Sequence, residues 1–377
     1  MSSPMNPAAA TPGGRSGRRR VLHLVTGGFS GATQVAVDLC RAALRSERIE
    51  PILVLRRKRH TDERRVQALR DEGLTVFVVP GWSHLATIWA LRRLCRELRP
   101  AVLLAHGFPE HLLGRWAGLW AGVPHLLQVE HNSRERYTRW RLWQARWLAR
   151  RSARLVGVSE GVRQRLLQLG MPEALCEAIP NGIALERFAD AGARPFAERE
   201  PGLVMSARFA RQKDHPTLIR ALGLLKSRGL RPTLQLAGAG KAGYRRAAEA
   251  LVRELGLDGQ VRFLGHYGQV PQLLMSQQIC VLATHWEGMP LALVEGMAAG
   301  CACVASAVPG VEGLLEPEVT GLLVPEGDAA ALADALERLL RDPALAARLG
   351  AAARARALAE HGLALMERRY EALLLSL

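Results

Sequence analysis

Residues 279–300 read ICVLATHWEGMPLALVEGMAAG, and this stretch decides the fold class. Its first five residues are apolar and predict a buried strand, while the small and apolar residues after Pro290 predict a helix. Residues 302–305 are predicted to form the next strand. A strand, a loop, a helix and a strand in this order are typical of a doubly wound parallel sheet, in which ligands bind at the carboxyl ends of the strands.

Two glutamates stand eight positions apart in this stretch, Glu287 on the predicted loop and Glu295 in the helix or its lead-in. Gly288 and Pro290 allow the loop to turn tightly and to approach a ligand closely. Carboxylates at this rim can accept hydrogen bonds from the vicinal hydroxyls of a sugar. The alternative is that both acids lie on a solvated face of the helix.

The segment resembles the nucleotide-sugar glycosyltransferases of family 4, in the retaining GT-B class. Their signature is a pair of glutamates separated by seven residues in a run such as EGMPLxLxEGMAxG. The resemblance implies a GT-B fold, an α/β architecture of two Rossmann-like doubly wound parallel-sheet domains facing across a cleft. It also implies that Glu287 contacts the hydroxyls of the donor sugar and that Glu295 holds the ribose. The loop residues Gly288, Met289, Pro290 and Leu291 would line the donor site.

A second motif, SARFARQKDHPTLIRA at residues 206–221, follows the first strand of the carboxy-terminal half. Arg208 and Lys213 stand on a loop where a diphosphate would lie, since guanidinium binds phosphate bidentately and ammonium acts as a point charge. The stretch resembles the GRL…QKG motif of the same family, which implies that both cations stabilise the leaving diphosphate. It departs from that motif at Ala207 and Asp214, where the family usually has glycine. The alternative is ordinary surface basicity.

Three further loops at strand ends are candidates for the site. Gly28 lies in the GGFSG turn at residues 27–31, whose backbone N–H groups could bind an anion. Gly238 begins a Gly-Ala-Gly turn that resembles a family turn close to the nucleotide. His131 follows the strand predicted at 125–129 and matches a family histidine near the reacting sugar. The alternative for the GGFSG turn is a tight turn without a binding role, and the alternative for His131 is a structural histidine.

Alternating strand and helix patterns along the chain predict two domains, because 377 residues are too many for one ordinary core. The predicted organisation is a disordered basic tail, an acceptor domain, a linker, a donor-binding domain and a last helix that crosses back to the first domain. The corresponding ranges are 1–20, 21–190, 191–201, 202–355 and 356–377.

The formal net charge of +16 and the pI near 10.7 favour phosphate-bearing partners, namely nucleic acid, anionic lipid or nucleotides. No apolar run reaches the roughly 18–20 residues that a membrane span needs, and we recognise no signal-peptide core. The six cysteines lack a zinc spacing and no Asp-x-Asp run ends a strand, so we expect neither a metal nor another cofactor. A cytoplasmic protein is expected.

Trp140, Trp143 and Trp147 recur at helical spacing among many arginines. A basic helix that carries tryptophan suits the surface of an anionic membrane. The alternative is an aromatic stripe that faces the core while the arginines face solvent.

These observations lead to the hypothesis of a retaining glycosyltransferase that moves a sugar from an NDP-sugar, preferably a UDP-sugar, to a glycan or lipid-linked acceptor. Lipopolysaccharide or envelope polysaccharide synthesis at the inner face of the cytoplasmic membrane is the expected setting. A nucleotide-sugar epimerase or phosphorylase of the same fold is one alternative. The other alternative is a non-enzymatic nucleic-acid-binding protein. The sequence contains no recognisable nucleic-acid-binding motif, so nucleic acid is not an expected partner.

Overall fold

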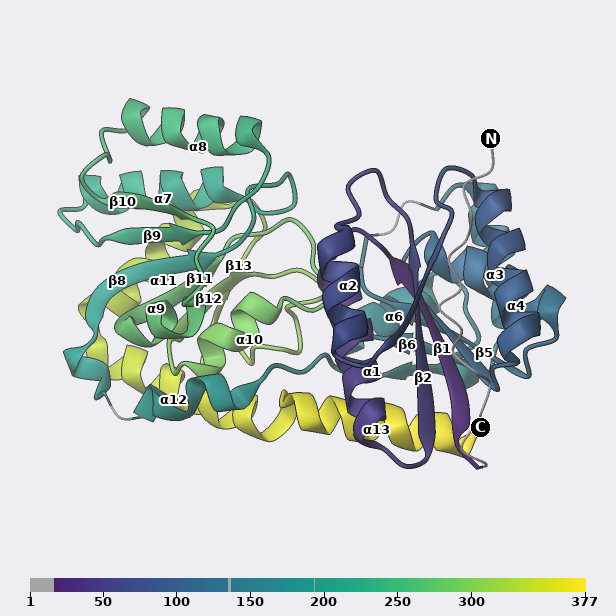
Figure 1. The fold of residues 1–377 in the computed structure, drawn as a ribbon. Helices are drawn as coiled ribbons and strands as arrows, with labels where there is room; N and C mark the ends of the chain where they lie inside the picture. The colour runs from purple at the N-terminus through teal and green to yellow at the C-terminus, as the bar shows by residue number, and fades with distance from the viewer. Residues whose placement is uncertain (1–16, 135–136, 193) are drawn as a thin grey trace. The chain divides into compact units, whose positions relative to one another are not determined.

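The computed structural model describes residues 17–134, 137–192 and 194–377. Two sheets organise the chain, and every strand pairing that we describe is parallel (Figure 1). The first has the strand order β3-β2-β1-β4-β5-β6-β7, and the second has β10-β9-β8-β11-β12-β13. This confirms the prediction of two doubly wound parallel-sheet α/β domains.

The strands of the first sheet are β1 (Arg19–Thr26), β2 (Ile49–Arg56), β3 (Thr75–Val79), β4 (Val102–His106), β5 (His125–Glu130), β6 (Arg154–Gly157) and β7 (Cys176–Ala178). The helices between them are α1 (Gly31–Arg45), α2 (Glu63–Asp71), α3 (His84–Leu98), α4 (Glu110–Ala121), α5 (Arg139–Ala149) and α6 (Glu160–Gln168). Three short 3-10 helices follow, η1 (Glu173–Leu175), η2 (Leu185–Gly192) and η3 (Phe196–Glu198).

The strands of the second sheet are β8 (Glu200–Ser206), β9 (Leu234–Ala237), β10 (Val261–Gly265), β11 (Gln277–Leu282), β12 (Ala302–Ser306) and β13 (Leu322–Val324). Its helices are α7 (His215–Ser227), α8 (Ala242–Glu254), α9 (Val270–Ser276), α10 (Leu291–Ala298), α11 (Ala329–Arg341) and α12 (Pro343–Glu360). The chain ends with α13 (Leu363–Ser376).

The described residues divide into two compact units, one formed by those up to 128 together with 373–377, and the other by those from 129 to 372. The domains predicted from the sequence, 21–190 and 202–355, each contain one sheet, so their limits differ from those of the compact units. The domain limits stay a prediction.

Alternating residues of β1 and β2 serve two separate cores in the first unit. Leu22 and Leu24 of β1 pack with residues of α3 and α4, whereas Val25 packs with α1 and α2. Successive side chains of a strand point to opposite faces, so a fully apolar strand requires helices on both faces. Figure 1 shows α1 and α2 on one side of β1 and β2, and α3 and α4 on the other.

Two expected boundaries differ from the structure. Residues 1–16 of the predicted basic tail lie outside the described residues, but Arg19 and Arg20 already belong to β1. Both arginines find partners there, Arg20 with Glu50 at 2.9 Å and Arg19 with the carbonyl of Leu374 at 2.6 Å. At the other end, the helix expected at 356–377 is two helices, because α12 runs to Glu360 and α13 starts at Leu363.

Candidate active site

Two motifs that lie about seventy residues apart in the sequence meet at the carboxyl end of the second sheet. Strand β8 pairs directly with β11, with Leu203 opposite Ile279. The loops that follow these strands therefore leave the sheet side by side. The backbone N–H of Asp214 donates to the carbonyl of Ala283 at 3.0 Å, and that of His285 donates to the carbonyl of Gln212 at 2.9 Å.

The carboxylate of Glu287 lies at this junction, and its side chain is only 6% exposed. The Lys213 ammonium forms an ion pair with Oε1 of Glu287, and the Thr284 hydroxyl donates to the same oxygen at 2.8 Å. The Gln212 amide donates to Oε2 at 3.1 Å. A buried carboxylate is costly unless it is paired and hydrogen-bonded. Both oxygens of Glu287 meet this condition, so the side chain has a fixed orientation.

The backbone of the glutamate loop is held by residues from the preceding part of the same unit. The Ser133 hydroxyl donates to the carbonyl of Glu287, and the Ser159 hydroxyl donates to the carbonyl of Gly288 at 2.7 Å. A Cβ on Gly288 would collide with the backbone oxygen of His131. Glycine at position 288 is therefore needed for close approach between two backbones.

Glu295 is the fifth residue of α10, and its side chain is 20% exposed. A guanidinium nitrogen of Arg187, on η2, lies 3.7 Å from its carboxylate. Burial raises the pKa of Glu295 above its usual value, and Arg187 opposes this shift. The group is thus a partly desolvated hydrogen-bond acceptor at the rim of the sheet.

The other residues of the predicted donor loop connect Glu287 to Glu295. Met289 is buried, and its sulfur accepts a hydrogen bond from the backbone N–H of Asn181 at 3.0 Å. Pro290 is buried and stands at the N-cap of α10, and Leu291 is the half-buried first residue of that helix. Met289 and Pro290 thus anchor the loop by packing.

The two predicted diphosphate-binding cations differ in their surroundings. Lys213 is largely buried and paired with Glu287. Arg208 is exposed, and among the described residues its guanidinium makes no ion pair or hydrogen bond. Arg208 follows β8 next to Gly238, which follows β9 and has a φ of 151°. A Cβ on Gly238 would collide with the carbonyl of Ala207, so the two loops pack backbone against backbone.

Asp214, where the resembled family motif has glycine, caps a helix. It is the N-cap of α7, and its carboxylate accepts from the backbone N–H of Thr217 at 3.2 Å. His215 is buried, stacks on Phe209 with centroids 4.2 Å apart, and lies 3.1 Å from the carbonyl of Lys213. Burial lowers the pKa of His215 to about 4. These contacts order the loop that carries Lys213.

His131 directly follows β5 and is half-buried. Its backbone N–H donates to a carboxylate oxygen of Glu130 at 3.1 Å. Burial lowers the pKa of His131 to about 3, so its imidazole is neutral near pH 7. A neutral imidazole can exchange hydrogen bonds with a sugar but supplies no positive charge.

Gly28 lies in the other compact unit, between β1 and α1. Its N–H is 3.4 Å from the Thr26 hydroxyl, and a Cβ on it would meet nothing closer than 3.6 Å. The crowded glycine is Gly27, whose added Cβ would lie 2.8 Å from the carbonyl of Arg56. A side chain is therefore excluded at position 27 but would fit at position 28. Gly28 stays a candidate whose exposed backbone N–H could donate to an anion.

Sequence reasoning missed the residues that hold the candidate site residues in place. These are Gln212 and Thr284 at the carboxylate of Glu287, Ser133 and Ser159 at the loop backbone, and Arg187 at Glu295. Gln212 had a signal, because it stands beside Lys213 in the second motif. Thr284 had one as well, because it lies in the first motif, three residues before Glu287. Ser133, Ser159 and Arg187 lie outside both motifs, and only the pairing of distant segments identifies them.

Within the described ranges, no cluster of three or more His, Cys, Asp or Glu side chains could hold a metal ion. Independence from metal stays a prediction. None of the helices in the described part of the chain is long and apolar enough to cross a bilayer.

Two family models match consecutive parts of the chain. The model described as Glycosyltransferase Family 4 matches residues 29–187, and the model described as Glycosyl transferases group 1 matches residues 187–356. Among the similar proteins, a putative glycosyltransferase of Bacillus subtilis, EpsF, is 29% identical over 77% of this chain and 80% of its own length. The UDP-Gal:alpha-D-GlcNAc-diphosphoundecaprenol alpha-1,3-galactosyltransferase of Escherichia coli is 24% identical over 73% of this chain and 77% of its own.

The fold is similar to that of HepE from Anabaena, solved in complex with UDP. The TM-score is 0.81 at 21% identity, and the match covers 95% of this chain and all of HepE. The two sheets, the site at the end of β8 and β11 and these matches define the class, a GT-B glycosyltransferase. The chain belongs to glycosyltransferase family 4.

Proposed function

We propose that this glycosyltransferase takes its sugar from a UDP-sugar, needs no metal and retains the anomeric configuration. The observation that carries the proposal is the Lys213–Glu287 ion pair between the loops that follow β8 and β11, with Arg208 on the same loop as Lys213. Cations placed beside a carboxylate that can accept from hydroxyls suit a sugar diphosphate. The E. coli relative is named for a UDP-Gal donor, and HepE was solved with UDP, which favours uridine.

Each residue has a separate role in this proposal. Arg208 and Lys213 stabilise the negative charge that develops on the departing diphosphate. Glu287 contacts the donor sugar, and Glu295 accepts from the ribose. Gly28, Gly238 and the loop from Gly288 to Leu291 bring their backbones close to the donor. His131 exchanges hydrogen bonds with the reacting sugar as a neutral imidazole.

Retention without a covalent enzyme intermediate is supported by the contacts of Glu287. Both of its oxygens already have partners. Oε1 pairs with the Lys213 ammonium and accepts a hydrogen bond from Thr284, and Oε2 accepts one from Gln212. A nucleophilic carboxylate would have to leave these partners to attack the sugar. In the proposal the leaving phosphate itself takes the proton of the acceptor hydroxyl while the acceptor attacks from the same face.

The acceptor that we propose is a glycan or a lipid-linked saccharide of lipopolysaccharide or envelope polysaccharide synthesis, used at the inner face of the cytoplasmic membrane. The name of the E. coli relative, which includes an undecaprenol-linked acceptor, supports this choice. Trp140 and Trp143 on α5 are 64% and 50% exposed, and their rings stack with centroids 4.8 Å apart. Their exposure argues against a stripe facing the core, and it favours a peripheral membrane contact.

The test is incubation of the purified protein with a panel of UDP- and GDP-sugars, with and without a chelator, in the presence of undecaprenol-linked saccharides. We expect transfer from a UDP-sugar, unaffected by chelation, and proton coupling constants of the product that match the donor's anomeric configuration. Transfer only from GDP-sugars would refute the UDP-sugar donor. Loss of transfer with the chelator would refute independence from metal, and an inverted product would refute retention. A rearranged nucleotide-sugar without transfer would favour the epimerase alternative.

A further inference from the structure

Helix α3, in the first compact unit, and the residue Trp82 before it expose large apolar side chains. Trp82, just before the helix, is 84% exposed, Leu85 is 65% exposed and Trp89 is 60% exposed. The opposite side of α3 is buried in a core cluster through Ile88 and Leu91. Large apolar groups clustered on a surface commonly mark an interaction site.

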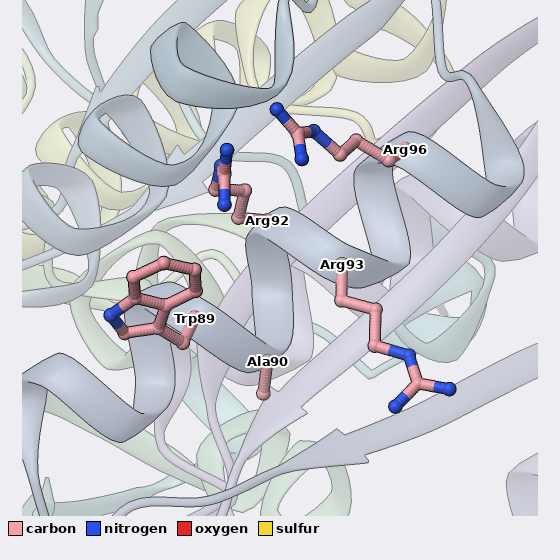
Figure 2. A pocket seen from close by; sticks show the side chains of 5 residues that line it. All are labelled: Trp89, Ala90, Arg92, Arg93 and Arg96. Atoms are coloured by element: carbon pink, nitrogen blue, oxygen red, sulfur yellow. The ribbon is translucent and has the colours of Figure 1, made fainter.

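The exposed residues continue into a group of arginines on the same helix face. At 100° per residue, Leu85, Trp89 and Arg96 align along the helix, and Arg92 and Arg93 flank this line. Arg92, Arg93 and Arg96 line a hollow of about 430 Å³ together with Trp89 and Ala90, and Figure 2 shows Arg92 and Arg96 pointing to one side and Arg93 to the other.

Among the described residues, no carboxylate pairs with the guanidinium groups of these arginines. The Arg92 guanidinium lies over the ring of Trp89, 5.0 Å from its centroid, and donates to the carbonyl of Trp120 at 3.1 Å. Neither Arg93 nor Arg96 makes an ion pair or a side-chain hydrogen bond within the described residues. Glu97 is the sole acidic residue in the sequence of α3.

We infer that this surface, formed by Trp82, Leu85, Trp89, Arg92, Arg93 and Arg96 and called the α3 surface below, binds an anionic membrane. Indole and leucine side chains partition into the boundary between headgroups and acyl chains, while arginines at its edge contact lipid phosphates. The apolar end of the α3 surface therefore suits the acyl-chain boundary, and its basic end suits the phosphate layer. The inference adds a second surface to the membrane contact proposed for α5, and it does not depend on that contact or on catalysis.

A second copy of the chain fits this surface less well. A two-fold contact of the α3 surface with itself would bury three guanidinium groups from each copy against a single acid, Glu97, in each helix. Burial of charges without partners is costly. Charge complementarity therefore favours an anionic surface over self-association.

The experiment uses the full-length protein and sedimentation with vesicles of phosphatidylcholine, with and without phosphatidylglycerol, at low and high salt. Wild type is expected to bind the anionic vesicles and to be released by salt. Because each basic residue near the surface contributes about five-fold in binding, Arg93→Gln/Arg96→Gln should weaken binding about 25-fold. A matched control, Arg246→Gln/Arg253→Gln on α8, removes two exposed arginines elsewhere and should lower binding far less.

A second variant, Trp82→Ser/Trp89→Ser, tests insertion by quenching with brominated lipids. We expect weaker binding and loss of much of the quenching, whereas Trp140→Ala/Trp143→Ala should leave the quenching from α3 in place. Circular dichroism and donor hydrolysis check that each variant is folded, and the arginine variant changes no apolar contact. Equal binding by wild type and both α3 variants would overturn the inference. So would absence of binding to anionic vesicles, tighter binding to a single-stranded oligonucleotide, or a dimer that the substitutions dissociate.

Discussion

Lys213 and Glu287 act as one pair at the residue scale, because each neutralises the other in a largely buried place. Arg208, in contrast, is exposed, and its guanidinium makes no ion pair or hydrogen bond among the described residues. Two cations with the same proposed role should therefore respond differently to substitution. A change at Arg208 removes charge from the site alone, whereas a change at Lys213 also leaves a buried carboxylate without its cation.

Arg208→Gln should lower turnover by about 10²-fold, the scale of losing one preorganised group that stabilises developing charge. It should change the free energy of unfolding by less than about 0.5 kcal/mol, as is usual for exposed positions. Steady-state kinetics and thermal unfolding measure the two effects. A variant with near wild-type turnover would exclude Arg208 from the diphosphate site.

Lys213→Ala should lower turnover at least as much and should also destabilise the protein by about 3 kcal/mol, because breaking a buried ion pair leaves an uncompensated charge. From the sequence alone, the position of Lys213 on a loop suggests that the fold tolerates its loss, but the buried ion pair with Glu287 predicts a destabilisation. In Lys213→Ala/Glu287→Gln the buried charge is gone, so stability should recover while activity stays low. If the double variant is as unstable as the single one, the pair is not the cause of the loss.

Glu295→Gln should change the pH dependence of stability in a defined direction. The pKa of Glu295 is raised in the folded chain, so its contribution to the free energy of unfolding decreases as pH rises between the ordinary and the raised value. Glu295→Gln should abolish this decrease and weaken the binding of UDP. Arg187→Gln removes the opposing cation, so it should raise the pKa of Glu295 in the folded chain further and extend the decrease to higher pH.

The measurements are unfolding temperature against pH for the three proteins and calorimetric titration with UDP. Identical pH profiles for wild type and Glu295→Gln would show that the carboxylate is not desolvated. Unchanged UDP affinity in Glu295→Gln would remove the proposed contact with the ribose.

At the scale of elements, the glutamate loop is fixed from two sides within its compact unit. Ser133 and Ser159 bind its carbonyls, and Gly310 lies so close that a Cβ there would collide with the carbonyl of Gly288. Strand β11 and helix α10 determine where the loop starts and ends. Its path between them is set by these backbone approaches, so the position of Glu287 depends on small residues that carry no chemistry.

Gly288→Ala should move the loop and lower turnover, because the added methyl group meets the rigid backbone of His131 rather than a flexible side chain. The expected cost in stability is about 1–3 kcal/mol, as for other overpacked sites. Gly268→Ala is the matched control, since its Cβ would meet nothing within 4 Å and its φ is not in the left-handed region. Equal activity of both variants would contradict the tight approach at position 288.

At the scale of the whole molecule, α13 has residues in both compact units. Within the second unit, its first backbone N–H, that of Leu363, donates to the carbonyl of Ile183 at 2.8 Å. Tyr370 is almost fully buried, and its hydroxyl has no hydrogen-bond partner in the described part of the chain. Burial raises the pKa of this phenol, with a further contribution from Glu177.

Tyr370→Ala should destabilise the protein by about 3–5 kcal/mol, because it removes a buried aromatic ring. Tyr370→Phe should be neutral or stabilising, since it removes a buried polar atom and keeps the ring. Chemical denaturation measures both values. A large loss in Tyr370→Phe would mean that the hydroxyl is hydrogen-bonded in the native protein.

Much of the fold could be predicted because its signals are local. Runs of apolar residues such as those of β1 and β11 predict buried strands, and the glycines and prolines between them predict the loops. The Glu287 and Glu295 motif also lies within one strand, loop and helix, so its neighbourhood is visible in the sequence. The positions of Arg208 and Lys213 at a strand end followed from the same kind of pattern.

The exposure of tryptophans could not be predicted in the same way. Helix α5 carries tryptophan and arginine on several sides, so its periodicity does not reveal which side faces the core. Helix α3 has apolar residues around most of its circumference near its start. Only packing against the sheet shows that Ile88 is buried while Trp89 is exposed.

The sequence by itself determined the class of fold, the strand ends that carry chemistry and the main candidate residues, because these depend on periodicity and on motifs of short span. The tertiary structure decided which of them meet. Strand β11 returns to lie beside β8 after two intervening strands, and this crossover places Lys213 against Glu287. It also decided which helix faces stay in water, because burial depends on contacts between residues that are far apart in the chain.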